Sequence, residues 1–302
     1  MKMKMRYFFP LLALLALVSC GRDEDFVAPS FLHIDAIDLV HSDNINVQWD
    51  GFYTSNIVAA YVVAHRPDAR SVDTIGLFQL PFTVPILYSG PLDYLELYPA
   101  VQQSGSSGAL PFYTFYNRIR LDSLSLQSGD TLDLGTLSTT YNITTSDVLM
   151  YEMFEPTEGS LLFDSVMQWR QIAPDEACSG LGYGFVPVPD SVYTVTFGID
   201  RDFRVTDATK LVYMELDSRS DMEYQLYMES SVIQGSNTTR YPVMTIRPSA
   251  EWRHLYINLG RTWSYFEHNP DFRLSFTAIN DSLKAGEIRL DNVRLLTTSV
   301  VL

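Results

Sequence analysis

One strand-like stretch places four aromatic or hydrogen-bonding side chains on the same face. Within residues 252–259, aliphatic side chains alternate with Trp252, His254, Tyr256 and Asn258. Side chains along a strand point alternately to its two faces, so these four share one side. Aromatic rings can cover the C–H face of a sugar and amides can bond its hydroxyls, which makes this face a candidate ligand-binding or partner-binding surface. The alternative, more usual for Trp and Tyr, is that the face packs inside the protein or lies under a loop.

The alternation slips in the last strand-like stretch of the chain. Two aliphatic pairs stand in opposite phase, Ile288 with Leu290 and Val293 with Leu295. One extra residue in a strand has this effect, so a β-bulge is expected at Asp291 and Asn292. A bulge re-aims side chains, and the Asp291 carboxylate is therefore a candidate functional group.

These two stretches resemble galactose-binding-like jelly rolls, the fold of many carbohydrate-binding modules. The resemblance rests on 252–260 (WRHLYINLG) and 286–295 (GEIRLDNVRL) and covers residues 148–302. It implies a jelly roll over that range, a fold that hosts many functions. In similar jelly rolls an acidic residue at this bulge and one near the first strand can hold a structural Ca²⁺. The metal candidates are then Asp291 with Glu152, Glu155 or Glu158, although Ca²⁺ needs six to eight oxygens and the sequence does not supply that count.

No catalytic motif stands out, and a non-enzymatic protein is expected. The patterns Gly-x-Ser-x-Gly and His-Glu-x-x-His are both missing, and no motif requires a cofactor. Many carboxylates are present, but none is singled out as a glycosidase pair. Cys178 lies in Glu-Ala-Cys-Ser-Gly and is interpreted as a small buried thiol near a turn, because no base is placed beside it.

The elements that must position these residues are strands throughout the chain. The run 57–64 (IVAAYVVA) is β-branched and apolar, and similar short runs recur between Gly, Pro and Asp residues. No segment keeps a helical period. We expect an all-β protein of two antiparallel β-sandwich domains, one at 30–136 and a jelly roll at 148–302, joined by a polar linker at 137–147.

The first of these domains resembles the Ig-like, PEGA-like or carboxypeptidase-regulatory-like modules of bacterial surface lipoproteins. The resemblance is carried by 73–81, 95–99 and 112–116, with their extended runs, prolines and aromatic residues. Such modules are usually non-enzymatic, so this resemblance also implies a structural or binding role.

The N-terminus has the layout of a secretory signal peptide. Basic Lys2, Lys4 and Arg6 precede an apolar run, and Leu-Val-Ser-Cys-Gly follows at 17–21. This layout resembles the lipobox of bacterial lipoproteins, which implies a signal peptide at 1–19 and lipidation, palmitate included, of Cys20. A transmembrane anchor is the alternative, but the apolar run is shorter than the roughly 20 residues that a bilayer core needs. A second alternative is an ordinary signal peptide in which the cysteine occurs by chance.

Acidic residues directly follow that cysteine. The tether at 20–29 carries Asp23, Glu24 and Asp25. It resembles the surface-export signal of Bacteroidota lipoproteins, which implies a cell-surface location on the outer membrane. The alternative is a plain solvated linker.

The charge of the chain excludes some partners. The signal segment holds three of the 21 basic residues and none of the 36 acidic ones, which leaves a formal charge of −18 on the mature chain. Nucleic acid is excluded as a partner, because its phosphates need Lys and Arg. Electrostatic adsorption to anionic lipid is excluded for the same reason.

A triplet of Asp, Ser or Thr, and an aliphatic residue recurs along the chain. It is similar to the O-glycosylation motif of exported Bacteroidota proteins, and the candidate hydroxyls are Thr74, Ser123, Thr131, Ser165, Ser191 and Ser282. The alternative is ordinary turn chemistry, in which Asp and Ser satisfy a turn before a strand begins.

Three functions follow from these patterns. The first is a lipid-anchored, non-enzymatic accessory protein of the cell envelope that docks on other outer-membrane proteins. The second is a surface glycan-binding lipoprotein that uses the jelly roll. The third is a hydrolase. The first two differ in what the face 252–258 meets, a protein or a sugar.

Overall fold

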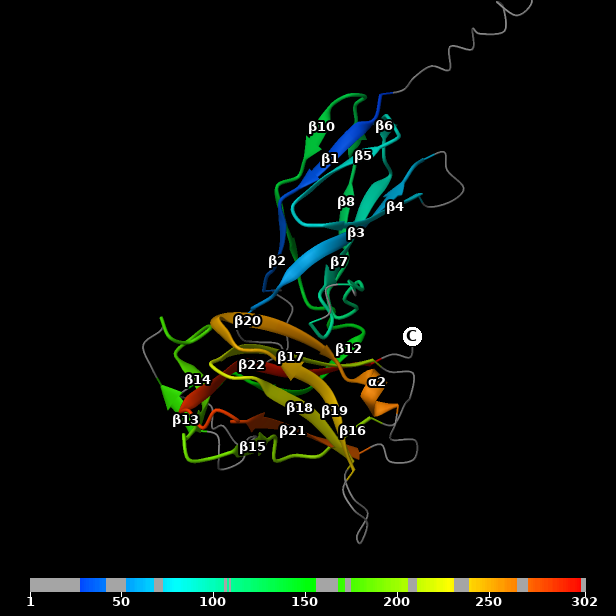
Figure 1. The fold of residues 1–302 in the computed structure, drawn as a ribbon. Helices are drawn as coiled ribbons and strands as arrows, with labels where there is room; N and C mark the ends of the chain where they lie inside the picture. The colour runs from blue at the N-terminus through cyan, green and yellow to red at the C-terminus, as the bar shows by residue number, and fades with distance from the viewer. Residues whose placement is uncertain are drawn as a thin grey trace, which may run out of the picture.

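The computed structural model describes most of the chain after residue 27. The described residues are 28–41, 53–67, 73–105, 108, 110–155, 168–171, 175–205, 211–230, 239–264 and 271–299. Residues 1–19, expected to form a signal peptide, lie outside these ranges, as do Cys20, Glu158 and Ser165. The structure forms two groups of strands stacked end to end (Figure 1), called here the first unit (β1–β11) and the second unit (β12–β22).

The first unit is built from short strands. They are β1 (Ser30–Ile34), β2 (Ala36–Leu39), β3 (Ile57–His65), β4 (Asp73–Gln79), β5 (Phe82–Ile86), β6 (Gly90–Pro91), β7 (Tyr94–Val101), β8 (Ile119–Asp122), β9 (Ser125–Leu126), β10 (Thr131–Asp133) and β11 (Thr136–Thr139). One layer has the order β4-β3-β7-β8, and the other contains β10-β1-β5 and β11-β2. A core lies between the layers, with Leu32 and Val84 on one side and Val62 and Leu97 on the other.

Two strand pairs of the first unit are parallel. β1 pairs with β10 and β2 pairs with β11, whereas the other pairs between the described strands are antiparallel. The chain passes from one small sheet to the other at two neighbouring points. Asp35 connects β1 to β2, and Leu134 and Gly135 connect β10 to β11. The bonds Asp35 N–H to Gly135 O (2.9 Å) and Leu134 N–H to His33 O (3.0 Å) hold the two crossings together.

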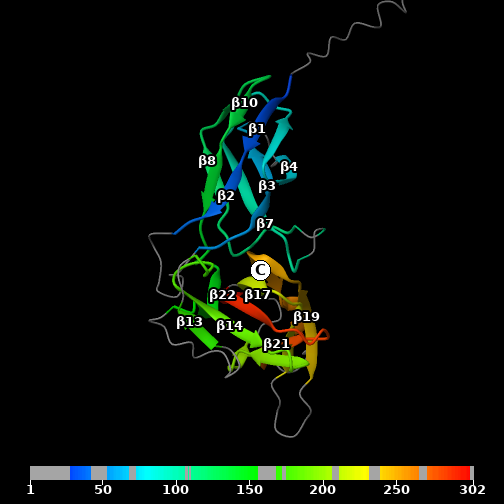
Figure 2. The ribbon, with the colours of Figure 1, turned by 60° about the vertical axis from the view of Figure 1, so that its left-hand side comes forward.

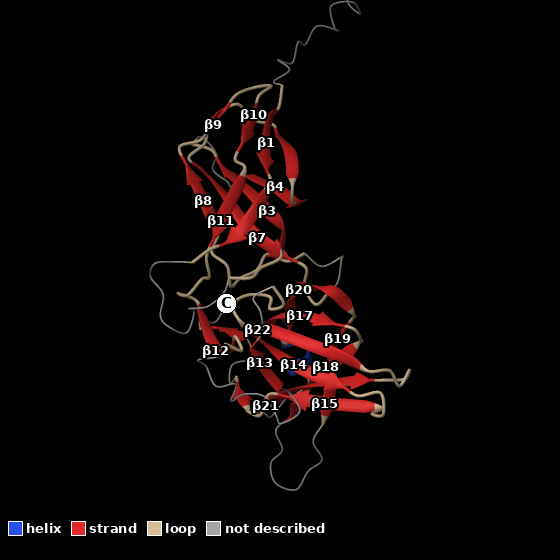
Figure 3. Ribbon diagram, turned by 90° about the vertical axis from the view of Figure 1, so that its left-hand side faces the viewer, coloured by secondary structure: helices blue, strands red, loops and turns tan. Residues whose placement is uncertain are grey.

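The second unit is a larger sandwich. Its elements are β12 (Ser146–Glu152), β13 (Gln168–Gln171), β14 (Gly182–Val188), β15 (Thr194–Gly198), β16 (Phe203–Arg204), β17 (Val212–Ser220), β18 (Tyr224–Ser230), β19 (Arg240–Ile246), β20 (Ser249–Asn258), α2 (Gly260–Trp263), β21 (Asp271–Ile279) and β22 (Gly286–Thr298). One sheet has the order β13-β14-β22-β17-β20, and the other has β15-β21-β18-β19. Figure 3 shows how fully strands dominate the described chain.

The apolar faces of these two sheets form the main core. Met214, Leu216, Ile257 and Leu295 meet aromatic and aliphatic side chains such as Phe276 from the opposite sheet. The sheet containing β17, β20 and β22 lies toward the first unit, and the sheet containing β15 and β21 lies on the far side (Figures 1 and 2). The outer face of the nearer sheet, which carries the residues at even positions of β20, therefore looks toward the first unit.

The bulge expected in the last strand is present. Between Glu215 and Asp217 the register on β22 moves from Arg294 to Asp291, so β22 contains one extra residue there. Asn292 takes up that residue with a φ of 47°, in the left-handed region that Asn tolerates better than most side chains. The prediction from the slipped alternation is confirmed.

An aromatic cluster joins the two units. The cluster consists of buried side chains from both units. The first unit contributes Tyr113, Phe115 and Tyr116, and Tyr141 comes from the segment that follows β11. They pack against Tyr213, Tyr256 and Leu296 of the second unit. A parallel bridge between Gln103 and Tyr256 adds backbone pairing across the contact. The units thus share a small core as well as a chain connection.

The all-β fold and its two sandwiches agree with the sequence. The segment 137–147, expected to be a polar linker, contains the end of β11 and Tyr141, which is 1% exposed. Polar composition alone did not distinguish a tether from a short strand followed by an aromatic anchor. The domain boundaries themselves stay predictions. No helix in the described part of the chain has the length and apolar character needed to cross a membrane.

Candidate functional site

The predicted face of β20 is divided between two environments. Tyr256 and His254 are 2% and 7% exposed, whereas Trp252 and Asn258 are partly buried. The prediction of an open face is therefore wrong for His254 and Tyr256. Strand alternation identifies which side of a sheet a residue occupies, but not that a second unit covers this side. The alternative from the sequence, cover by other parts of the protein, applies to them.

Tyr256 and Asn258 both bond to the first unit, Asn258 through its backbone N–H, which donates to the Ser104 hydroxyl at 3.3 Å. The Tyr256 hydroxyl bonds the Tyr116 hydroxyl at 2.9 Å and accepts the Asn56 N–H at 2.9 Å. The Asn258 amide donates to the Tyr213 hydroxyl at 3.0 Å, and its oxygen accepts the Gly260 N–H at 2.8 Å. The hydrogen-bonding groups of both residues are thus engaged in structural contacts.

His254 belongs to a buried polar network centred on Asp217. Its Nδ1 lies 3.0 Å from Asp217 Oδ1, while Asp217 Oδ2 accepts bonds from Thr54 (2.6 Å) and the Asn292 amide (2.7 Å). Burial by itself would raise the pKa of the Asp217 carboxyl, but His254, Thr54 and Asn292 hold that pKa below its usual value. The carboxylate stays ionised and fixes the orientation of the imidazole.

Asp291 lies beside this network, and the pKa of its carboxyl is shifted in the opposite direction to that of Asp217. It is opposite Asp217 on the neighbouring strand and is fully buried. Burial raises the pKa of its carboxyl to about 8, against the lowering effect of the N–H groups of Asn292 and Ser179, and the Asp217 charge adds to the rise. Two carboxylates close together favour one proton between them.

Cys178 lies at the same place in the fold. Burial raises the pKa of its thiol well above the usual range, and the charges of Asp217 and Asp291 raise it further. The thiol is therefore protonated at neutral pH and unreactive. Cys178 is partly buried, however, and not the fully buried thiol that the sequence suggested.

A second buried network was not found from the sequence. Glu215 Oε1 accepts the Tyr113 hydroxyl at 2.7 Å and Oε2 accepts the Tyr141 hydroxyl at 2.5 Å. Arg294 Nη1 lies 4.0 Å from Oε2, the oxygen that Tyr141 bonds. Glu215 and Arg294 face each other across β17 and β22 on the side away from the main core. A charged residue in the middle of an otherwise apolar strand is the signal that would have identified each of them.

A groove of about 920 Å³ opens beside this buried region, where the first unit meets the edge of the second. Its walls follow β19 and β20, which end the order of their two sheets. The lining residues are Ser55, Asn56, Gln102, Ser104, Gly105, Glu223, Met244, Thr245, Ile246, Arg247, Trp252, Arg253, His254 and Leu255. Two of the four predicted face residues, Trp252 and His254, therefore line a real cavity.

Trp252 and His254 present different chemistry to the groove. The Trp252 indole donates to Glu176 O at 3.2 Å and meets Tyr183 edge to face, so its ring is held in one orientation. The His254 side chain is 3% exposed, and its Nε2 has no hydrogen-bond partner in the part of the chain that the structure describes. A buried polar atom of this kind costs free energy unless something bonds it.

The described carboxylates proposed for calcium each accept a backbone N–H, and a calcium ion held by Asp291 and one of the glutamates stays a prediction. Glu152 accepts the N–H of Phe154, Glu155 accepts the N–H of Leu181, and Asp291 accepts that of Asn292. Within the described residues they form no group whose ligand atoms lie within 4.8 Å of one another. Asp291 also accepts the N–H of Ser179 at 3.3 Å, in the loop before β14.

The candidate glycosylation hydroxyls within the described ranges are all exposed. Thr74 and Thr131 lie on strands, whereas Ser123, Ser191 and Ser282 lie in turns or bends. Their exposure is compatible with both modification and turn chemistry, so the prediction stays open.

No family model matches the sequence. No curated protein matches it either. Among solved structures it is similar to a family 61 carbohydrate-binding module in complex with β-1,4-galactotriose, with 11% identity over 44% of this chain and 83% of that one and a TM-score of 0.28.

Two further modules give similar values. For a family 29 carbohydrate-binding module the identity is 14% over 51% of this chain and 88% of the other, with a TM-score of 0.32. For the family 11 module of a Clostridium thermocellum cellulase the identity is 15% over 49% of this chain and 95% of the other, with a TM-score of 0.32. With TM-scores this low, the likeness says nothing about what this chain binds.

Proposed function

We propose that this protein binds a saccharide, without altering it, in the groove between its two units. The observation that carries the proposal is that His254 lines this groove together with Trp252, and that its buried Nε2 has no partner among the residues that the structure describes. A sugar hydroxyl can donate to or accept from a ring nitrogen in either tautomer, which makes it a suitable partner for that atom.

The other groove residues suit a polyhydroxylated ligand. Asn56 and Gln102 offer amides, Ser55 and Thr245 offer hydroxyls, and Arg247 offers a guanidinium with several donors. These groups contribute through hydrogen bonds, while the indole of Trp252 contributes apolar surface for C–H groups. Both kinds of contact are needed to hold a sugar, whose faces and edges differ in polarity.

The lining residues favour binding over hydrolysis. Glu223 supplies the carboxylate among the described lining residues, whereas glycoside hydrolysis generally uses two carboxylates flanking the scissile bond. The buried Asp217 holds His254 rather than facing the groove as a second acid. The glycan-binding function, ranked second from the sequence, is thus the one that the groove supports better.

The test is calorimetric titration of the protein with soluble polysaccharides and their oligosaccharides. We expect Trp252→Ala and Arg247→Ala to weaken binding by about 1–3 kcal/mol each, as loss of an anchoring side chain does. Tyr193→Ala is the matched control, because Tyr193 is 59% exposed and outside the groove. Equal affinities for all four proteins would place the ligand elsewhere, and no binding across the panel would contradict the proposal.

The proposal also includes a location at the cell envelope, which is supported by the N-terminal sequence alone. Lipidation of Cys20, the outer-membrane location and docking on another envelope protein all concern residues or partners outside the described structure. Labelling cells with a palmitate analogue tests the anchor, because Cys20→Ala should lose both the label and the membrane association.

A further inference from the structure

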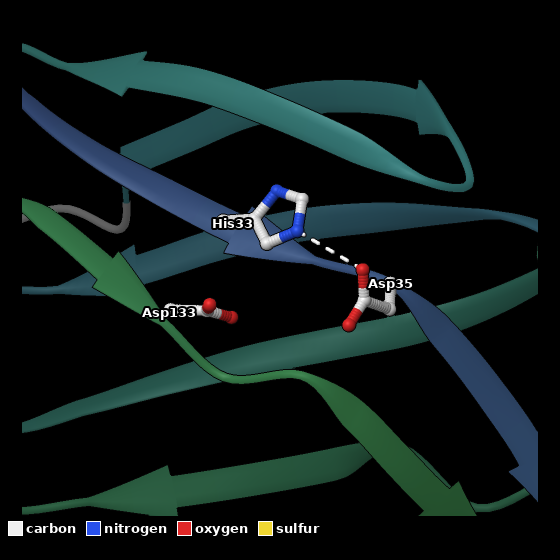
Figure 4. A group of neighbouring side chains, drawn as sticks. All are labelled: His33, Asp35 and Asp133. Carbon is white, nitrogen blue, oxygen red and sulfur yellow. Dashed lines mark hydrogen bonds and ion pairs between the residues drawn. The ribbon is translucent and has the colours of Figure 1, made fainter.

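The ligand atoms of His33, Asp35 and Asp133 gather at the point where two parallel strand pairs of the first unit change sheet. One ligand atom from each residue lies within 4.8 Å of those of the other two. His33 is on β1 and Asp133 is its register partner on β10, while Asp35 follows β1 directly. Figure 4 shows the three side chains around this crossing, with the His33–Asp35 pair marked. The site is in the first unit and shares no residue with the groove.

From this arrangement we propose that His33, Asp35 and Asp133 bind a divalent transition-metal ion of the Zn²⁺ type. Imidazole nitrogen and carboxylate oxygen are ligands that Zn²⁺ takes at about 2.0–2.2 Å. A tetrahedral ion at that distance separates its ligand atoms by roughly 3.3 Å. The pair His33 Nε2–Asp35 Oδ1 is already 3.0 Å apart, so small side-chain rotations complete the set.

The contacts around the three residues orient them as metal ligands. His33 Nδ1 bonds the Thr83 hydroxyl at 2.8 Å, which leaves Nε2 facing the two carboxylates. A hydroxyl both donates and accepts, so Thr83 keeps this bond when the imidazole proton moves to Nδ1 and frees Nε2 for a metal. Such a partner on the second ring nitrogen is usual for a metal-binding histidine.

Backbone hydrogen bonds fix the carboxylate of Asp133 and the main chain of Asp35. Asp133 Oδ1 accepts the Gly135 N–H at 2.9 Å, which leaves its second oxygen for the metal. The Asp35 N–H donates to Gly135 O at 2.9 Å, so both acids are tied to one glycine with a φ of 58°. The fixed crossing of the strands therefore positions the ligands in advance.

The ligand set determines which metal fits. Two carboxylates and a neutral imidazole balance a divalent ion, and three protein ligands leave a coordination position for water. The site faces solvent, since the side chains of His33 and Asp35 are 27% and 58% exposed. Ca²⁺ and Mg²⁺ prefer all-oxygen sites, so the nitrogen ligand favours Zn²⁺ over both.

Titration of the full chain with ZnCl₂, CaCl₂ and MgCl₂ tests the proposal, with His33→Gln and Asp133→Asn as the ligand variants. We expect Zn²⁺ to bind the unaltered protein, and each variant to bind it at least tenfold more weakly. Asp38→Asn is the matched control, because Asp38 is an exposed acid on the adjacent β2 and outside the group. It should bind Zn²⁺ like the unaltered protein.

Thermal melts give a second readout that does not depend on the heat of binding. Zn²⁺ should raise the melting temperature of the unaltered protein and of Asp38→Asn, but not of His33→Gln, since a ligand that binds only the folded state stabilises it. If all four proteins bind Zn²⁺ equally, the ion sits elsewhere and the proposal is overturned. It is also overturned if none binds, in which case His33 and Asp35 form an ordinary ion pair.

Discussion

Asp217 and Asp291 illustrate how far environment separates two identical side chains. They face each other on β17 and β22, yet the pKa of Asp217 is held down and that of Asp291 is raised to about 8. The difference follows from their partners. Asp217 has His254, Thr54 and an amide, whereas Asp291 has mainly backbone N–H groups and a neighbouring negative charge.

The raised pKa predicts that the protein loses stability as pH rises from about 4 to about 8. In this window Asp291 is ionised in the unfolded chain, with an ordinary pKa near 3.9, but keeps its proton in the folded state. The folded state binds more protons, so its stability is greatest below the window and falls by up to roughly 1.4 kcal/mol per pH unit. Denaturant unfolding between pH 4 and 9 measures this.

Asp291→Asn should flatten the pH dependence over that window, because an amide does not titrate. Asp147→Asn, at an exposed acid on β12, is the control and should leave it as it was. Asp217 acts in the other direction, since its stabilising effect is lost only as pH falls through its lowered pKa. A stability that is level or rising between pH 4 and 8 would contradict the assignment for Asp291.

At this scale the sequence located the candidate residues better than it described their surroundings. Trp252 and His254 line a groove, but Tyr256 and the backbone of Asn258 on the same strand bond the first unit. Alternation follows from local geometry and is visible in the sequence. What covers a face depends on contacts between residues about 140 positions apart, such as Tyr116 and Tyr256, and no local pattern records them.

At the scale of elements, the bulge of β22 was the most informative local feature. The change of phase in the aliphatic pattern marks the extra residue that the register shows between Arg294 and Asp291. The bulge turns the Asn292 amide toward Asp217 Oδ2, at 2.7 Å, so a backbone irregularity organises the buried network.

Asn292→Ala and Asn292→Gly should differ in stability for a backbone reason alone. Both remove the amide, but only Gly adopts the φ of 47° without a steric penalty. We expect the Ala variant to be less stable by about 1 kcal/mol in urea unfolding. An Ala variant as stable as the Gly variant would mean that the bulge relaxes to an ordinary strand.

Strand positions were predictable but some strand partners were not. Apolar runs bounded by Gly, Pro and Asp identify strands through local chemistry, as at β3 (Ile57–His65). The parallel pairs β1–β10 and β2–β11 join residues about 100 positions apart. Since β2 and β11 are four residues each, their sequences carry too little pattern to show the pairing. The group at His33, Asp35 and Asp133 was missed for that reason.

At the scale of the whole molecule, the aromatic cluster makes the two units one folding system. Phe115 is fully buried, and its ring lies 5.3 Å from that of Tyr113 and 5.6 Å from that of Tyr213 in the second unit. Glu215 and Tyr256 add buried hydrogen bonds across the same contact. Breaking this contact exposes both apolar and polar groups at once.

We predict a single calorimetric transition for the unaltered protein and two transitions for Phe115→Ala. The truncation removes a ring from the shared cluster and lowers the free energy of unfolding by about 3–5 kcal/mol. Because the cluster lies between the units, this loss weakens the interaction that makes them unfold together. Val84→Ala, inside the core of the first unit, is the control. It should lower the melting temperature but keep one transition. Two transitions in the unaltered protein would show that the cluster does not couple the units.

The parallel pairing of β1 with β10 and of β2 with β11 also sets how the protein responds to mechanical force. If the N-terminus is tethered and the groove holds a fixed polymer, tension enters at β1 and leaves through β11 toward the second unit. Those paths run side by side in the same direction, so the load shears their backbone hydrogen bonds together instead of unzipping them one by one. Forced unfolding follows the height of the unfolding barrier. Under such a load, the parallel pairs β1–β10 and β2–β11 would resist tension along the long axis of the first unit.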